Sequence, residues 1–156
     1  MRAELIDGKA IAEAIRGEVA ADVLRLSAQG VVPGLTVVLV GDDAASATYV
    51  GAKEKASKAA GMVGGTIRLP ASTSQAELLA LVEQLNADPT VHGILVQMPL
   101  PKHIDPDTVI RHIRPDKDVD GFHPENVGKL LIGHTDGFVS CTPAGVIELL
   151  LRSGVD

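Results

Sequence analysis

Residues 35–41 read LTVVLVG, a short run of aliphatic side chains without polar alternation. A strand that faces water on one side alternates apolar and polar residues, whereas a strand buried on both faces is apolar throughout. Pro33 and Gly34 interrupt the chain immediately before the run, as expected at a strand boundary. This stretch therefore predicts a strand that is covered on both of its faces.

The segments around this strand alternate between helical and strand patterns. Upstream, apolar residues recur at helical spacing and Gly30 ends the pattern. Downstream, the patterns predict helices over 45–61, 74–88, 106–113 and 142–153, and strands over 64–69 and 91–98. This order predicts an α/β fold, a layered α/β/α domain with a mostly parallel sheet, in which ligands bind at the carboxyl ends of the strands.

Composition narrows the classes of protein to consider. The 156 residues suffice for a single domain over 1–156, and the net charge of −6 argues against a nucleic-acid partner. No apolar run has the length of a membrane span, and the N-terminus lacks the layout of a signal peptide. The single cysteine, Cys141, excludes an internal disulfide and suits a reducing compartment. We therefore expect a cytoplasmic protein.

Tyr49 and Lys53 are candidates for a ligand site on the second helix. They stand four residues apart in SATYVGAKEKA and therefore share one face. The tyrosine ring offers a surface for stacking, and a lysine in a buried setting exchanges protons. An ordinary helix with a solvated lysine explains the same spacing.

Gln97 is a third candidate, because it ends the apolar run VHGILVQ just before Pro99 and Pro101. Its amide both donates and accepts hydrogen bonds, so it can orient a lysine or hold a substrate carbonyl. A glutamine that satisfies loop backbone groups is the alternative.

Residues 114–126, RPDKDVDGFHPEN, contain aspartates at alternate positions. Asp116, Asp118, Asp120 and Gly121 match the first half of a calcium-binding loop, but the twelfth position is Val127 instead of glutamate. Prolines on both sides indicate that helices do not flank the segment closely. A polar turn, or one carboxylate that accepts hydrogen bonds from a guanidine-like edge, remains open.

Other potential chemistry is weaker. The five histidines lack the spacing of a zinc site, and no metal ligands are assigned. Cys141 lies in SCTPAG, where Thr142 is expected as the N-cap and Pro143 as the first residue of a helix. The N-terminus of a helix can lower the pKa of a thiol, but no partner base for Cys141 is evident. A structural or substrate-lining role for Cys141 is favoured.

Four stretches in this order resemble one enzyme family: VGDDAASATYVGAKEKA (40–56), GILVQMPLP (93–101), PDKDVDGFHPENVG (115–128) and SCTPAGV (140–146). The chain resembles the N-terminal catalytic domain of bifunctional methylenetetrahydrofolate dehydrogenase/methenyltetrahydrofolate cyclohydrolases over nearly its whole length.

The resemblance implies roles for individual residues. Lys53 resembles the catalytic lysine, Tyr49 the tyrosine that stacks on the substrate, and Gln97 the glutamine that tunes the lysine. Asp120 resembles the aspartate that binds the amino and amide edge of the pterin. Lining of the folate cleft is expected from Val50, Pro99 and Leu100.

The resemblance also implies an activity and its partners. Tetrahydrofolate derivatives would be the substrates: 5,10-methylenetetrahydrofolate is oxidised with NADP, and the methenyl product is hydrolysed to 10-formyltetrahydrofolate. The family's Rossmann-type NADP domain is expected to be missing here, with helix 142–153 leading toward it and no cofactor-binding residues in this chain. A homodimer is expected for the full-length family. A folate-binding module without turnover is the alternative.

Overall fold

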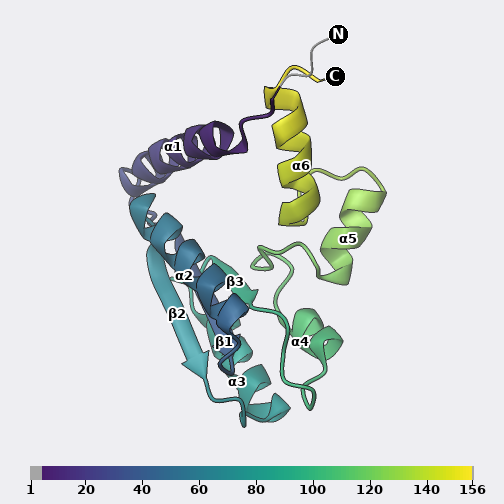
Figure 1. Ribbon diagram of the computed structural model, residues 1–156. Helices are drawn as coiled ribbons and strands as arrows, with labels where there is room; N and C mark the ends of the chain where they lie inside the picture. Colours follow the sequence, from purple (N-terminus) through teal and green to yellow (C-terminus); the bar gives the residue numbers. More distant parts are fainter. Residues whose placement is uncertain (1–4, 156) are drawn as a thin grey trace.

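The computed structural model describes residues 5–155, which fold around a small parallel sheet (Figure 1). Strand β1 (Gly34–Val40) lies between β2 (Val63–Leu69) and β3 (Gly93–Val96), and both pairings are parallel. The helices are α1 (Gly8–Ser27), α2 (Ala44–Ala59), α3 (Gln75–Ala87), α4 (Pro106–His112), α5 (Pro124–Leu131) and α6 (Cys141–Arg152). The predicted α/β class with a parallel sheet is confirmed.

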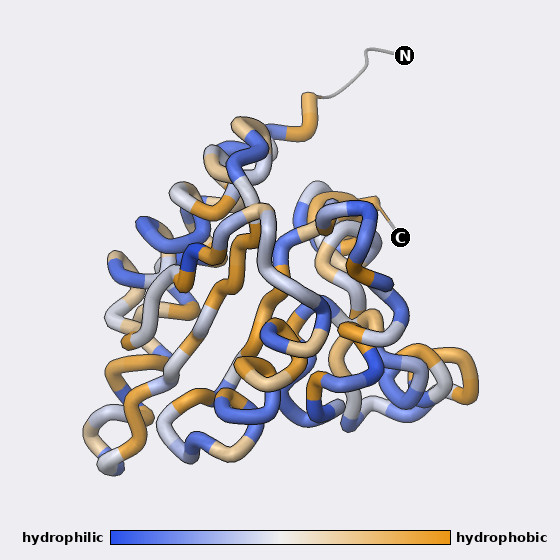
Figure 2. Tube along the Cα trace, turned by 90° about the horizontal axis from the view of Figure 1, so that it is seen from below, coloured by the Kyte–Doolittle hydropathy of each residue, from blue (hydrophilic) through white to orange (hydrophobic). Residues whose placement is uncertain are grey.

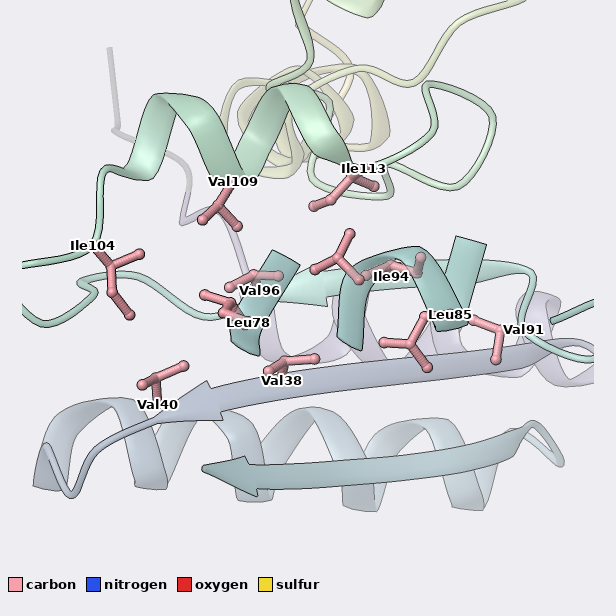
Figure 3. Close-up of a cluster of buried hydrophobic side chains, with 11 residues drawn as sticks. Val38, Val40, Leu78, Leu85, Val91, Ile94, Val96, Ile104, Val109 and Ile113 are labelled. Atoms are coloured by element: carbon pink, nitrogen blue, oxygen red, sulfur yellow. The ribbon is translucent and has the colours of Figure 1, made fainter. Parts of the chain in front are cut away.

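Residues 35–41 behave as their composition predicts, because both faces of β1 are buried. Alternate side chains of β1, including Val38 and Val40, join α3 and α4 in the larger core cluster, which Figure 3 shows above the strand. The remaining ones, Val37 and Leu39, pack against Val50 of α2. The sheet is therefore a middle layer between α2 on one face and α3 with α4 on the other. Figure 2 shows the apolar segments running through the strands of this layer.

Side-chain caps begin the two helices that follow β1 and β2. Asp43 Oδ1 accepts a 2.7 Å hydrogen bond from the backbone N–H of Ser46 at the start of α2. At α3, Ser74 and Glu77 form the reciprocal capping box that their spacing suggests. These caps fix where α2 and α3 start relative to the strand ends.

The region 114–141 differs most from the sequence expectations. Pro124 does not keep helices away from the aspartate run, because it is the first residue of α5, where a missing N–H costs no hydrogen bond. The last helix begins at Cys141 with Ser140 as its N-cap, so the expected N-cap Thr142 is already helical. Pro143 lies in the first turn, whose N–H groups have no partner within the helix, and the earlier start is therefore permitted.

Helices α1 and α6 lie beside each other, outside the layered body (Figure 1). Arg152 connects them through a bidentate pair with Glu18, at 2.7 and 2.8 Å. Val23 is the only buried residue of α1, and α6 has none. None of the helices within residues 5–155 is long and apolar enough to cross a membrane.

Candidate functional site

The side chains of Lys53 and Gln97 meet across the interface between α2 and the end of β3. Lys53 Nζ donates a 3.0 Å hydrogen bond to Gln97 Oε1. Gln97 Nε2 in turn donates to the backbone carbonyl of Met98 at 2.8 Å. Because this second bond occupies the amide nitrogen, the amide oxygen faces the lysine. Gln97 therefore orients the Lys53 side chain without adding charge to the site.

Asp120 lies near Lys53 and belongs to the loop between α4 and α5. Burial raises the pKa of its carboxyl, and the negative charge of Asp118 raises it further, while the nearby Lys53 opposes the rise. The side chain is half-buried. The structure therefore brings an amine, an amide and a carboxyl from three distant stretches to one place.

The three aspartates of the run point to three different places. Asp116 accepts hydrogen bonds from the Arg114 guanidinium at 2.9 and 2.6 Å on the surface. Asp118 is buried and accepts from the backbone N–H of His123 at 2.8 Å. Because these carboxylates do not converge, the calcium-loop hypothesis is wrong for this segment.

The other candidate residues differ in their settings. Tyr49 lies one helical turn from Lys53 and is 65% exposed, so its ring is available for stacking. Val50 of α2 is fully buried between this helix and the sheet, so its side chain cannot line an open cleft. Pro99 is exposed beyond Gln97, whereas Leu100 packs against the cluster on the opposite side of the sheet from α2.

Cys141 lies near Lys53 and Asp120 at the first turn of α6. Its Sγ is 3.6 Å from the carbonyl oxygen of Val119. Partial burial of the thiol raises its pKa, the Asp120 charge raises it further, and Lys53 opposes the rise. These effects outweigh any lowering of the thiol pKa by the helix N-terminus. A thiol in this setting is a lining group and a weak nucleophile.

An open hollow of about 770 Å³ lies beside the polar cluster formed by Lys53, Gln97 and Asp120. Lys53 and Cys141 are part of its lining. Most of its lining is apolar and comes from the first helix, α2 and the starts of β1 and β3, including Leu26, Pro33, Leu35, Ala56, Met62 and Leu95. Gln97, Asp120 and Tyr49 are not part of this lining. The polar cluster therefore has apolar surface on one side.

The first two helix starts after the strands do not suit a dinucleotide phosphate. The loop after β1 carries Asp42 and Asp43, and Asp43 already caps α2. The hydrogen bonds from Ser46 lower the Asp43 pKa, so this helix start holds a carboxylate. Ser74 and Glu77 occupy the start of α3 in the same way. NADP phosphates would meet negative charge at both positions.

Comparisons with known proteins identify the family of the chain. Residues 6–120 match the family model described as tetrahydrofolate dehydrogenase/cyclohydrolase, catalytic domain. The chain belongs to this family. The bifunctional protein FolD of Rhodospirillum rubrum is 60% identical over 154 residues, which cover 96% of the chain and 52% of that relative.

Solved structures of this family share the fold. The bifunctional FolD dehydrogenase/cyclohydrolase of Campylobacter jejuni is 46% identical with a TM-score of 0.96, over 98% of this chain and 54% of that one. The Trypanosoma brucei enzyme, described as complexed with NADP cofactor and inhibitor, is 41% identical with a TM-score of 0.93, over 99% and 54%. The chain thus spans about half the length of the curated family members it matches.

Two groups close to Lys53, Gln97 and Asp120 were not predicted from the sequence. One is the Met98 carbonyl, which holds the Gln97 amide and is a backbone group without a sequence signal. The other is Asn126, which is buried in α5 and contacts Asp118 at 3.0 Å. A buried polar residue in the first turn of an unpredicted helix is recognisable only after that helix has been placed.

Proposed function

We propose that this chain is the folate-processing catalytic domain of a methylenetetrahydrofolate dehydrogenase/methenyltetrahydrofolate cyclohydrolase. The observation that supports it most is the 3.0 Å bond from Lys53 to Gln97, with Asp120 beside the lysine. In this proposal the two-ring head of a tetrahydrofolate derivative lies against these groups. Asp120 accepts hydrogen bonds from its amino and amide N–H groups, and the exposed ring of Tyr49 stacks on it.

The proposed reaction on these residues is hydrolysis of 5,10-methenyltetrahydrofolate. Water attacks the one-carbon bridge, and Lys53, as the neutral amine, accepts the proton that the water loses. The new hydroxyl group then loses its proton and becomes the formyl carbonyl as the bond from this carbon to one ring nitrogen breaks, and the nitrogen takes the proton that Lys53 accepted. The products are 10-formyltetrahydrofolate and one released proton, which balances the positive charge of the substrate. Gln97 holds the lysine in position, and general acid–base catalysis of this kind accelerates reactions about 10²- to 10⁴-fold.

Oxidation of 5,10-methylenetetrahydrofolate belongs to the proposal only for a longer protein. When bound, NADP supplies the hydride acceptor for that step. The starts of α2 and α3 do not fit its phosphates, so we derive no step through it from these residues. A cytoplasmic location, a single domain over 1–156 and a homodimer of the full-length protein are also part of the proposal.

The test follows the absorbance of methenyltetrahydrofolate with the wild-type chain and with Lys53→Ala, after subtraction of the spontaneous rate. A loss of the catalysed rate in the variant is expected. Equal catalysed rates would remove Lys53 from the mechanism.

A folate-binding module without turnover is the second candidate. The observation in its favour is the openness of the site, since Tyr49 is 65% exposed and water reaches the stacking surface. Catalysis commonly requires closure of such a site. Calorimetry separates the two candidates, because heat of binding without a catalysed rate supports the module.

A further inference from the structure

Asp118 is buried only two residues before Asp120. Its exposed fraction is 2%, and its Oδ2 accepts hydrogen bonds from His123 N at 2.8 Å and from Asn126 Nδ2 at 3.0 Å. A buried carboxylate is costly unless donors satisfy it in this way. The loop that carries Asp120 therefore has a charged anchor inside the protein.

Asn126 joins three stretches of backbone through one side chain. Its Nδ2 donates to the carbonyl of Pro115 at 2.9 Å as well as to Asp118. Its Oδ1 accepts from the backbone N–H of Phe138 at 3.3 Å. The Asn126 amide thus connects three parts of the chain: Pro115 and Asp118 in the loop between α4 and α5, and Phe138 in the segment that leads into α6.

The segment held by Asn126 covers the backbone on both sides of Asp120. Gly121 has φ +66°, and a Cβ there would lie 2.7 Å from Ser140 N. On the other side, Val119 O contacts the Cys141 thiol at 3.6 Å. The position of Asp120 therefore depends on contacts that Asp118 and Asn126 maintain.

We propose that Asp118 and Asn126 are positioning residues that aim the Asp120 carboxyl at the site shared with Lys53 and thereby set the affinity for the heterocycle. The inference rests on the proposed function, because it assigns a role in binding the same ligand. Asp118 acts in a second way, since its charge raises the Asp120 pKa.

Asn86 supplies a matched control, because it is a buried asparagine with a similar bonding pattern. Its Nδ2 donates to His112 O at 2.8 Å and its Oδ1 accepts from Arg114 N at 3.0 Å. These bonds connect α3 with the end of α4 and with Arg114, and neither of them involves Asp118 or the segment that leads into α6. A variant at Asn86 therefore measures the effect of losing a buried amide without disturbing Asp120.

The experiment compares Asn126→Ala and Asn86→Ala in the 156-residue chain. The measurements are thermal melting, calorimetry with folinic acid, a stable formyl derivative of tetrahydrofolate, and an NMR titration of the ¹³C-labelled Asp120 carboxyl. Both variants are expected to melt at lower temperature. Asn126→Ala alone is expected to weaken binding by about 10- to 100-fold, the range that a small misplacement in a site costs. Its Asp120 pKa should also fall toward the ordinary value as the turn opens to water.

Asp118 provides a second pair of variants, which decides the case if Asn126→Ala does not fold. Asp118→Asn keeps an oxygen acceptor, so binding should stay within about threefold of wild type, the scatter of mild substitutions. Its Asp120 pKa should fall, because a neighbouring negative charge is lost. Asp118→Leu removes the acceptor and should lose binding in the same way as Asn126→Ala.

Unchanged affinity or an unchanged Asp120 titration in Asn126→Ala would overturn the proposal, and so would equal binding losses in Asn86→Ala. If Asn126→Ala does not fold, the two Asp118 variants decide. The proposal is then overturned if Asp118→Leu binds folinic acid as tightly as Asp118→Asn does. A wild-type chain that does not bind folinic acid contradicts the proposed function instead. In that event the Asp120 titration alone decides whether these two residues position the carboxyl.

Discussion

Lys53 and Lys55 lie two residues apart on α2 and have different surroundings. Lys53 is partly buried and bonded to Gln97, whereas Lys55 is exposed to water. The proposed hydrolysis needs an amine that can lose and regain a proton, and a guanidinium cannot do this in a protein. The chemistry of this single group therefore distinguishes catalysis from binding.

Lys53→Arg is expected to lower the catalysed hydrolysis rate about 10²- to 10⁴-fold, which is the usual contribution of a general base. Affinity for folinic acid should change much less, because arginine keeps N–H donor groups at this position. Lys55→Arg is the matched control and should keep the wild-type rate. Stopped-flow absorbance with calorimetry checks both quantities. A Lys53→Arg variant that retains the full rate would show that no proton passes through this position.

The raised pKa of Asp120 makes the stability of the chain depend on pH. Between the ordinary value of 3.8 and the raised value, the folded chain binds more protons than the unfolded chain. The free energy of unfolding therefore falls as the pH rises through this window, and the loss persists at neutral pH. An ionised carboxyl in this position therefore lowers the stability of the folded chain.

Asp120→Asn is expected to raise the melting temperature at pH 7, because the variant has no carboxyl to ionise. The difference from wild type should disappear below pH 3.8, where the wild-type carboxyl is also neutral. Affinity for folinic acid should fall about 10- to 100-fold, as expected for the loss of hydrogen bonds to a charged acceptor. Melting curves from pH 3 to pH 8 with parallel calorimetry test both effects. A variant less stable than wild type at pH 7 would contradict this account.

At the scale of elements, the sequence predicts those parts whose local pattern matches their final surroundings. The apolar run 35–41 is the central strand, and Ser74 with Glu77 starts α3, because burial on two faces and a capping box both have local signatures. The edge strand β2 and the short β3 were also located, within one or two residues at each end. Long-range contacts were not required for any of these.

The region 114–141 shows what a local pattern does not contain. Helix α5 has only eight residues, and the local pattern does not predict it, because a proline stops a helix as readily as it begins one. Asp116 pairs with Arg114, Asp118 accepts a hydrogen bond from Asn126, and Asp120 lies near Lys53. Asn126 and Lys53 lie outside the loop between α4 and α5 that carries the three aspartates. Spacing alone therefore could not assign one role to each aspartate, and it was the family resemblance that singled out Asp120.

Gly121 is the element-scale test of this region. A side chain there would have to adopt φ +66° and would lie 2.7 Å from Ser140 N and from Val139 C, both backbone atoms. Gly121→Ala is therefore expected to lower the free energy of unfolding by about 1–3 kcal/mol and to weaken folinic acid binding. Gly17→Ala, in the interior of α1 with nothing within 4 Å, should instead raise stability by about 0.5–1 kcal/mol. Urea unfolding measures both, and equal effects of the two substitutions would refute the packing argument.

At the scale of the whole molecule, the chain consists of a well-packed α/β body and a pair of helices attached to its side. The body has the two core clusters on either face of the sheet. Helices α1 and α6 together contribute one buried residue, Val23, and meet through the exposed Arg152–Glu18 pair. Exposed ion pairs contribute little to stability, so these helices should open more easily than the sheet.

Native-state hydrogen exchange tests this division. Amides of β1 and β3 are expected to exchange only through global unfolding, because their strands lie in the buried middle layer, whereas amides of α6 should exchange through local opening at much lower free energy. Leu78→Ala, which empties a fully buried position in the larger core, should lower strand protection by about 2–5 kcal/mol. The α6 rates should not change in this variant, because local opening does not depend on the core. If α6 instead lost protection in step with β1, the two parts would form one cooperative unit, and the site at the start of α6 would be as rigid as the sheet beneath it.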